Sequence, residues 1–378
     1  MHDASMTDVG EIEPDYTLYS ALGSMYSGKA RGYMNYKKLN YIDQPISILD
    51  MISIKRNTGE AVMPAVKTKD GEWLQDTTII IEELEKRHPE RSIGANTPIQ
   101  FAVSHLLELW ADEYWLPIAM HYRWSFGDEN VEFLAKENGA TLAPFLPKFA
   151  QRWMGRLATA NLPKAAPIVG FIPEQHKMLE NWTEHTLDLL ETHFTHHDYL
   201  LGGRPTVADY GLLASFFGHL NRDPVPKRIL MSKRPNLTAW VERTHGGDDA
   251  SGDLMPDDAL PETLMPILRC VFDEALPMLA AYRDRLNEHI AEQNLVSGDL
   301  IPRYLERAEF PMLDQRFGRP AWPFSLWKIQ RVQNKIQALP EADQQKINGW
   351  LADNFGQKVS DFDAGPELIR HGLSTKLA

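Results

Sequence analysis

The spacing of hydrophobic and polar residues divides the chain into three zones. In the first zone, residues 15–90, short apolar runs alternate with helical stretches. The apolar runs predict strands over residues 16–21, 46–52, 61–67 and 73–74. One predicted helix follows the turn at Gly23, and another begins at Asp76 or Thr77 and ends before Pro89. An alternating α/β unit of this size predicts a small sheet with helices on its faces.

The second zone, residues 98–246, has helical spacing throughout, because its apolar residues recur three and four positions apart. Pro117 is expected to interrupt the first helix of this zone. Thr206 is a good N-cap with Asp209 at the third helical position, as in a capping box. Further helices are expected over residues 147–159, 174–194 and 206–220.

The third zone, residues 254–378, follows a polar, Gly-rich break at 246–253. Helical spacing extends over 262–293, with an expected kink at Pro277. A Pro-rich extended stretch and a final helical region follow. We expect this extension to be mostly helical and to pack on the second zone.

The composition is typical of a water-soluble protein that buries a hydrophobic core. Its net charge argues against some classes of partner. Of 378 residues, 43% are apolar and 24% are charged, and the length predicts two or three packed units. The formal charge of −13 argues against a nucleic-acid binder and against adhesion to anionic lipid. Cys270 is the one cysteine, which excludes an internal disulfide and a CxxC pair.

Neither end of the sequence carries a recognisable targeting signal. Residues 1–14 are polar and acidic, so they predict a disordered lead and not a secretory signal. No run approaches the ~20 apolar residues of a membrane span. We therefore expect a cytoplasmic protein with no membrane span.

Four motifs stand in a consistent order along the first two zones. The first is a strand with Tyr19 near its end, followed by a helix start at residues 24–31 (SMYSGKAR). The second is the Met63-Pro64 step, and the third is the stretch 75–84 (QDTTIIIEEL). The fourth is the cap at Thr206 that follows residues 199–203 (YLLGG). Together these motifs resemble the glutathione S-transferase family, of the Ser-type, over residues 15–246.

The resemblance implies an α+β protein: a thioredoxin-like domain over 15–90, an all-α domain over 98–246 and an unusual helical extension over 254–378. It also implies a homodimer. The chain departs from the family pattern at the helix start, where no cysteine is present and Met25 replaces the usual proline. Asp76 stands where glutamate is more common.

The resemblance implies a glutathione site with Ser24 as its catalytic residue. A free thiol with a pKa of ~8.5 is only about 3% ionised at pH 7, and lowering the pKa by ~2 units requires about 2.7 kcal/mol. A hydroxyl donor at a helix N-terminus is suited to this task. Met63, beside a cis Pro64, would pair with the peptide portion of glutathione, and Asp76 and Thr77 would hold its γ-glutamyl end.

Several alternatives stay open around this site. Tyr19, Tyr26 and Ser27 are rival hydroxyl donors, and each of the expected site residues also has a purely structural explanation, such as a helix cap. Lys55 and Arg56 are candidates for pairing the glycyl carboxylate. The pocket for the second substrate is expected from aromatic residues, which at helical spacing are also typical of a core: Tyr26, Trp110, Tyr114 and Trp115.

Histidines cluster late in the second zone without forming a convincing metal site. His193 and His197 are four positions apart, but no third ligand has a suitable spacing. We therefore interpret this cluster, which includes His185 and His196, as a solvated face and expect no metal.

The sequence supports three functions. The first is a glutathione transferase that activates the thiol as a thiolate for attack on a small apolar electrophile. The second is a glutathione-dependent reductase of disulfides or peroxides. The third is a non-catalytic binding protein that uses its extension for a partner. Fold alone does not choose among them.

Overall fold

A computed structural model describes residues 13–142, 145–160, 162–247, 250 and 252–378. The expected disordered lead therefore falls, except for its last two residues, outside the described part. Residues 16–87 form a four-stranded mixed sheet with helices packed on it. Its elements are β1 (Tyr16–Ser20), α1 (Met25–Tyr36), β2 (Tyr41–Pro45), α2 (Ile48–Thr58), β3 (Ala65–Thr68), β4 (Trp73–Gln75) and α3 (Thr77–Arg87).

The strand order β2-β1-β3-β4 is that of a thioredoxin-like domain, as expected. β1 pairs with β2 in parallel, whereas β1–β3 and β3–β4 are antiparallel. The buried strand residues Leu18 and Val66 belong to the main core, which Tyr33 of α1 and Ile80 of α3 also enter.

One predicted strand is wrong. Residues 46–52 do not form a strand, because Ser47 begins helix α2 with a capping box. The Ser47 hydroxyl accepts from the Asp50 N–H at 3.2 Å, and the Asp50 carboxylate accepts from the Ser47 N–H at 2.8 Å. The second strand lies earlier, at Tyr41–Pro45, where polar residues hid it from the hydrophobic pattern.

The all-helical domain begins at Pro98, close to the expected boundary. Pro117 stands in the first turn of α5, where a missing N–H costs nothing, so it marks a helix start. The predicted capping box at Thr206 and Asp209 is confirmed at the start of α10. The helices are α4 (Pro98–Tyr114), α5 (Leu116–Trp124), α6 (Asp128–Leu142), α7 (Lys148–Thr159), α8 (Ala166–Val169), α9 (His176–His196), α10 (Val207–Ser215), the π-helical η3 (Phe216–Leu220), α11 (Pro224–Ile229) and α12 (Pro235–Gly246).

The extension contains strands as well as helices. The sequence pattern predicted extended chain in its Pro-rich stretch but not the two small antiparallel sheets, β6–β7 and β5-β9-β8. A π-helical segment precedes Pro277, which stands in the first turn of α14. The elements are α13 (Met265–Cys270), the π-helical η7 (Val271–Ala275), α14 (Leu276–Gln293), β5 (Leu300–Ile301), β6 (Arg307–Met312), β7 (Gln315–Pro320), α15 (Pro323–Gln337), α16 (Glu341–Phe355), β8 (Leu368–His371) and β9 (Ser374–Leu377).

Single 3-10 turns complete the secondary structure: η1 (Leu162–Ala165), η2 (Pro173–Gln175), η4 (Met231–Lys233), η5 (Pro256–Asp258), η6 (Glu262–Leu264) and η8 (Val359–Asp361).

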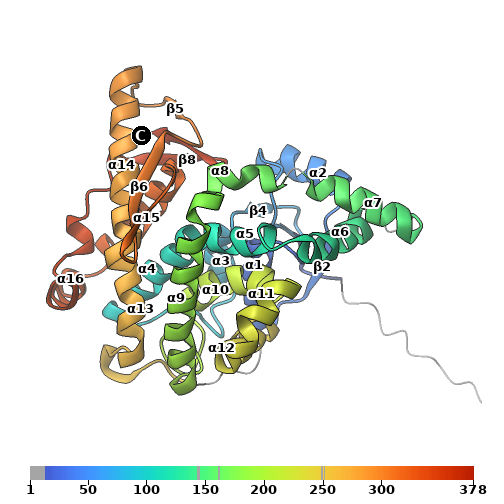
Figure 1. Ribbon diagram of the computed structural model, residues 1–378. Coiled ribbons are helices and arrows are strands. Elements are labelled where there is room, and N and C mark those ends of the chain that lie inside the picture. Colours follow the sequence, from blue (N-terminus) through green and yellow to red (C-terminus); the bar gives the residue numbers. More distant parts are fainter. Residues whose placement is uncertain (1–12, 143–144, 161, 248–249, 251) are drawn as a thin grey trace, which may run out of the picture.

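Helix α9 lies between two peripheral parts of the molecule (Figure 1). The extension, in orange and red, lies on one side of α9, and the α6–α7 hairpin projects on the other. Helix α1 packs on α10 and α12, while α15 and α16 of the extension pack on α4. Helix α4 thus lies between the extension and the thioredoxin-like domain. In the described part of the chain, no helix is long and apolar enough to cross a membrane.

Candidate functional site

A cavity of about 330 Å³ opens where the three parts of the chain meet. The thioredoxin-like domain lines one wall with Tyr26, Val62, Met63, Pro64, Gln75, Asp76 and Thr77. The helical domain contributes Glu113, Leu116, Met120, Ala165, Ile168 and Val169. The extension lines the remaining wall with Arg303, Tyr304, Trp322, Phe324, Lys328, Arg370 and Leu373.

The first wall presents backbone groups and a helix start. The Met63–Pro64 peptide bond is cis, as the resemblance implied. Gln75 holds this segment, because its side-chain amide donates to the carbonyl of Glu60 at 3.1 Å and to that of Val62 at 2.9 Å. The loop before β3 is therefore tied to the end of β4.

Asp76 and Thr77 lie where β4 passes into helix α3. Asp76 is the N-cap, has a φ of 79° and accepts from the Thr78 N–H at 3.0 Å. Thr77, the first helical residue, is buried. The N-terminus of a helix attracts negative charge through its free N–H groups and its dipole. This corner of the cavity thus combines a carboxylate with an anion-attracting helix end.

Ser24 caps helix α1, and its side chain accepts from the Ser27 N–H at 3.3 Å. It is half-buried and is not among the residues that line the cavity, although Tyr26 of the same turn is. Arg123 fixes the preceding turn: its guanidinium donates to the carbonyls of Gly23 at 2.5 Å and Gly218 at 2.6 Å.

Among the rival hydroxyls, Tyr26 is the one that donates a hydrogen bond within the described residues. The Tyr26 hydroxyl donates to the Asp112 carbonyl at 3.1 Å, and burial raises the pKa of Tyr26. Tyr19 stacks on Trp73 with ring centroids 5.2 Å apart. Ser27 is buried, and its oxygen accepts from the Ala21 N–H at 3.3 Å.

Three aromatic residues expected in the substrate pocket lie in the core instead. Trp110 and Trp115 are buried around Trp182, with ring centroids 6.3 Å and 5.0 Å from it. The Tyr114 hydroxyl donates to the Pro311 carbonyl at 3.0 Å. The reason is that α9 and the β6–β7 hairpin cover this face of α4, so only Tyr26 of the expected aromatic set lines the cavity.

Lys55 and Arg56 are also misplaced as carboxylate partners. Both side chains are exposed on the last turn of α2, outside the cavity lining. The cations that do line the cavity come from the extension, which sequence reasoning did not connect with the site.

A buried ion cluster borders the cavity and is formed by Lys29, Glu108, Asp112, Glu113 and Lys328, of which Glu113 and Lys328 line the cavity. Lys29 contacts Glu108 and Asp112, each at 2.8 Å. Lys328 reaches Asp112 at 3.0 Å and Glu113 at 3.2 Å. Burial by itself lowers the pKa of Lys328, but the two carboxylates outweigh it and hold the pKa well above its usual range. Lys328 is therefore charged and already paired.

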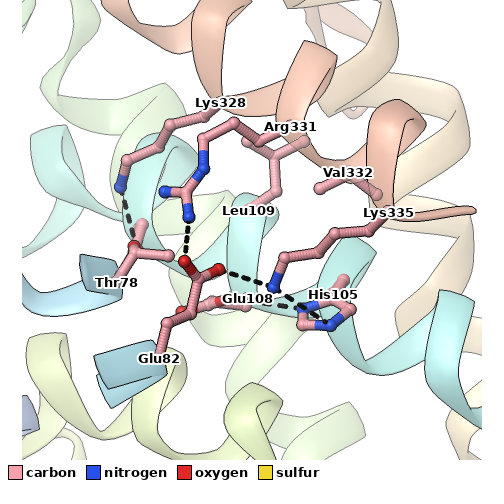
Figure 2. A pocket seen from close by; sticks show the side chains of 10 residues that line it. Thr78, Glu82, His105, Glu108, Leu109, Lys328, Arg331, Val332 and Lys335 are labelled. Carbon is pink, nitrogen blue, oxygen red and sulfur yellow. Dashed lines mark hydrogen bonds and ion pairs between the residues drawn. The ribbon is translucent and has the colours of Figure 1, made fainter. Parts of the chain in front are cut away.

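A second cluster, formed by Glu82, Arg331 and Lys335, ties α3 to α15 (Figure 2). The Glu82 carboxylate pairs with Arg331 and with Lys335, the latter at 2.6 Å. Neighbouring His105 is half-buried, and its partial removal from water lowers its pKa. The signal in the sequence was the spacing of Lys328, Arg331 and Lys335, which places three cations on one face of a helix.

The histidine cluster differs from its expected exposure at one position. His185 and His196 are exposed, but His193 is buried and bonds to the Thr263 hydroxyl at 2.9 Å and the Tyr199 carbonyl at 3.2 Å. Burial lowers the pKa of His193 to about 4. Over the described residues, no group of three or more His, Cys, Asp or Glu is placed to hold a metal ion.

Family comparisons agree with this architecture. Residues 18–92 match the model of the glutathione S-transferase N-terminal domain, and residues 183–243 match that of the C-terminal domain. These matches show that the chain contains a glutathione S-transferase N-terminal domain and a glutathione S-transferase C-terminal domain. A comparison with curated proteins gave no match.

Solved structures with a related fold include the β-etherase LigF from Sphingobium sp. strain SYK-6, at 21% identity and a TM-score of 0.42 over 68% of this chain and 99% of that one. A glutathione S-transferase from Methylobacterium radiotolerans JCM 2831, in complex with glutathione sulfonate, is 17% identical over 65% and 99% of the two chains, with a TM-score of 0.38. FzlA from C. crescentus is 17% identical over 66% and 97%, with a TM-score of 0.37. Likenesses at this level carry no information about the substrate.

Proposed function

We propose that the protein binds glutathione in the three-walled cavity and activates its thiol for attack on a small electrophile. The observation that carries this proposal is the first wall, where cis Pro64, Asp76 and the start of α3 line one continuous cavity. These are the positions that the family resemblance assigns to glutathione.

The wall matches the charges of the tripeptide. The Asp76 carboxylate is suited to the γ-glutamyl ammonium group, and the first-turn N–H groups at Thr77 are suited to its carboxylate. The backbone N–H and C=O of Met63 would pair with the cysteinyl residue in the manner of an added strand. The thiol would then lie toward the first turn of α1.

Ser24 is the hydroxyl that we assign to the thiol, because it caps α1 and is half-buried, whereas Ser27 on the same turn is fully buried. Its oxygen accepts a hydrogen bond from the backbone, and no acceptor within the described residues takes its proton. The competing Tyr26 proton goes to the Asp112 carbonyl. A hydroxyl donor and the α1 dipole favour the thiolate over the thiol. The thiol proton leaves to solvent, and the sulfur then forms a bond to the electrophile as the leaving group departs with its electron pair.

A protein thiol is a poor candidate for the chemistry. Cys270 is buried, is not among the residues lining the cavity, and has a pKa that burial raises. The glutathione sulfur is therefore the expected nucleophile.

The test is an ultraviolet difference titration of reduced glutathione against pH, which follows the thiolate band. Wild type is expected to give a saturable signal with a midpoint about 2 units below that of free glutathione. Ser24→Ala should keep the fold and raise the bound-thiol pKa by about one unit or more. Ser27→Ala, on the same turn, is the matched control and should leave the midpoint within about 0.3 units. An unchanged midpoint in S24A would assign the donor role elsewhere, and no binding at millimolar glutathione would contradict the proposal.

We also propose a homodimer on the strength of the family resemblance. Light scattering at micromolar concentration is expected to give twice the chain mass of 43.1 kDa. A mass near that of one chain would contradict this expectation.

A further inference from the structure

The extension supplies a cavity wall that differs in chemistry from the glutathione wall. We propose that this wall is the binding site for the second substrate and that it selects an aromatic molecule bearing a carboxylate, with Arg303 as the group that holds the carboxylate. This inference rests on the proposed glutathione function of the same cavity.

The aromatic part of the wall is built from Tyr304, Trp322 and Phe324. Tyr304 and Trp322 lie with ring centroids 5.4 Å apart and ring planes at 54°. Across the cavity, α5 and α8 contribute the aliphatic side chains of Met120 and Ile168. Aromatic and aliphatic surfaces in one cavity favour a flat, apolar ring system.

Trp322 is held in place by a buried cation that is not itself part of the lining. The Arg319 guanidinium carbon lies 4.9 Å from the Trp322 ring centroid. Arg319 is fixed in turn by the Tyr282 hydroxyl at 2.5 Å and the Glu113 carbonyl at 2.9 Å. The buried indole N–H of Trp322 finds no hydrogen-bond partner in the described part of the chain. A ligand oxygen would supply the missing acceptor.

Two guanidinium groups on this wall carry charge that the described part of the protein does not neutralise. Arg303 lies over the Tyr304 ring at 5.2 Å, and the Arg370 Nε donates to the Gly372 carbonyl at 3.1 Å. Within the described residues, no ion pair joins either group to a carboxylate. Lys328 differs, because Asp112 and Glu113 already pair with it. In a chain of formal charge −13, two unpaired cations on one cavity favour anionic ligands.

We assign one of these two arginines to a carboxylate of glutathione. Its γ-glutamyl carboxylate is matched by the start of α3, which leaves the glycyl carboxylate. Arg370 belongs to the β8–β9 hairpin, and the turn residue Gly372 lies against the Glu60 side chain, next to the loop that leads to Met63. Arg370 is therefore the partner we assign to the glycyl end, and Arg303, beside the aromatic side chains, is left for the second substrate.

The test compares 4-chloro-3-nitrobenzoate with 4-chloro-3-nitrobenzamide, which has a similar shape and no charge. Binding of each to the full-length protein is measured by calorimetry, with and without saturating S-methylglutathione, whose blocked sulfur cannot react with the probes. We expect wild type to bind the benzoate about tenfold more tightly than the benzamide, as for one charge-assisted guanidinium–carboxylate contact. Arg303→Met should remove this preference and leave benzamide and glutathione affinity unchanged.

Three further variants make the assignment specific. Arg303→Lys should keep part of the preference, because it keeps the charge but loses the planar fork. Arg269→Met removes an exposed arginine of α13 that does not line the cavity, and should leave the preference intact. Arg370→Met should weaken glutathione and leave the benzoate-to-benzamide ratio unchanged.

The outcomes separate this inference from the proposed function. Equal affinity for the two probes, or a preference that survives R303M, overturns the inference while saturable glutathione binding leaves the transferase proposal standing. Loss of the preference in R370M but not in R303M also overturns it. Loss of glutathione binding in wild type overturns the transferase proposal instead.

Discussion

The two outer walls of the cavity use different chemistry to present charge. On the thioredoxin-like wall, polar groups are backbone amides, a helix start and the Asp76 carboxylate, and local hydrogen bonds fix them. On the extension wall, charge is carried by the side chains of Arg303 and Arg370, set among aromatic rings.

This difference assigns separate tasks to the walls. Backbone groups in a fixed arrangement are suited to a partner with a constant peptide backbone and constant charged ends, as glutathione would be. Cavity-lining side chains outside the four-stranded sheet can change without disturbing that sheet, so they are suited to selecting the variable second substrate. The prediction is that Asp76 variants affect glutathione alone and Arg303 variants affect the second substrate alone, while Arg370 is the one extension residue assigned to glutathione.

The largest expected effect is on the free energy of unfolding, at the buried ion cluster that joins α1 to α4. Lys29→Met leaves Glu108 and Asp112 as buried carboxylates without their shared partner, which typically costs about 3–5 kcal/mol. Glu82→Gln, in the cluster between α3 and α15, is the control and should cost less than about 1 kcal/mol because Glu82 and Lys335 are partly exposed. Urea unfolding at pH 7 measures both, and similar losses would show that the two junctions are equivalent.

The second largest effect is a loss of stability in acid, at the contact between α9 and the start of the extension. His193 joins Tyr199 to Thr263 near the start of the extension, and burial lowers its pKa to about 4. The unfolded chain, with a pKa near ~6.5, binds the proton more tightly, so stability is lost as the pH falls from about 6.5 toward 4.

The loss from this one residue is about 2 kcal/mol between pH 7 and pH 5. Over this range, the free energy of unfolding of His193→Gln should therefore fall by about 2 kcal/mol less than that of wild type. The free energy of unfolding of His196→Gln, at an exposed position, should fall as that of wild type does. Urea unfolding at the two pH values is the measurement, and identical pH dependence of H193Q and wild type would refute the assignment.

A smaller effect tests the glutathione wall alone. Asp76→Ala removes the carboxylate expected to hold the ammonium group and should weaken glutathione binding by about tenfold, while the affinity for 4-chloro-3-nitrobenzoate stays within about twofold. Asp70→Ala, on the exposed turn before β4, is the control for loss of one negative charge. Calorimetry with each ligand decides, and equal weakening of both ligands would break the division of tasks.

The smallest effect is expected at the cations that sequence reasoning first chose. Lys55→Met and Arg56→Met should change glutathione affinity by less than about twofold, because both side chains are exposed away from the cavity lining. A tenfold loss of glutathione affinity in either variant would show that a cation of α2 binds the glycyl carboxylate, and would remove the reason for assigning that carboxylate to Arg370.

Local signals in the sequence were enough to predict the local structure of the thioredoxin-like wall. The cap of α1 at Ser24, the Met63-Pro64 step and the cap of α3 at Asp76 each depend on a few adjacent residues. The strand prediction at 46–52 failed for a reason that is also local. Ser47 and Asp50 form a helix cap that outweighs the strand propensity of the apolar run. Its residues Leu49 and Ile52 are exposed, so apolar character alone did not reveal which face is buried.

Tertiary structure decided what the sequence left open. Trp110, Tyr114 and Trp115 lie on an apolar helix face, and periodicity shows that such a face is covered but not by what. The β6–β7 hairpin and α9 cover it, which turns an expected pocket into core. Likewise, Arg303 and Arg370 line the same cavity as Met63 only because the extension folds back over the first domain. More than 200 residues of chain separate them from Met63. The sequence by itself determined most elements of the first two domains and the local structure of the thioredoxin-like wall, since these follow from short-range caps and turns, whereas the second wall exists only through long-range packing.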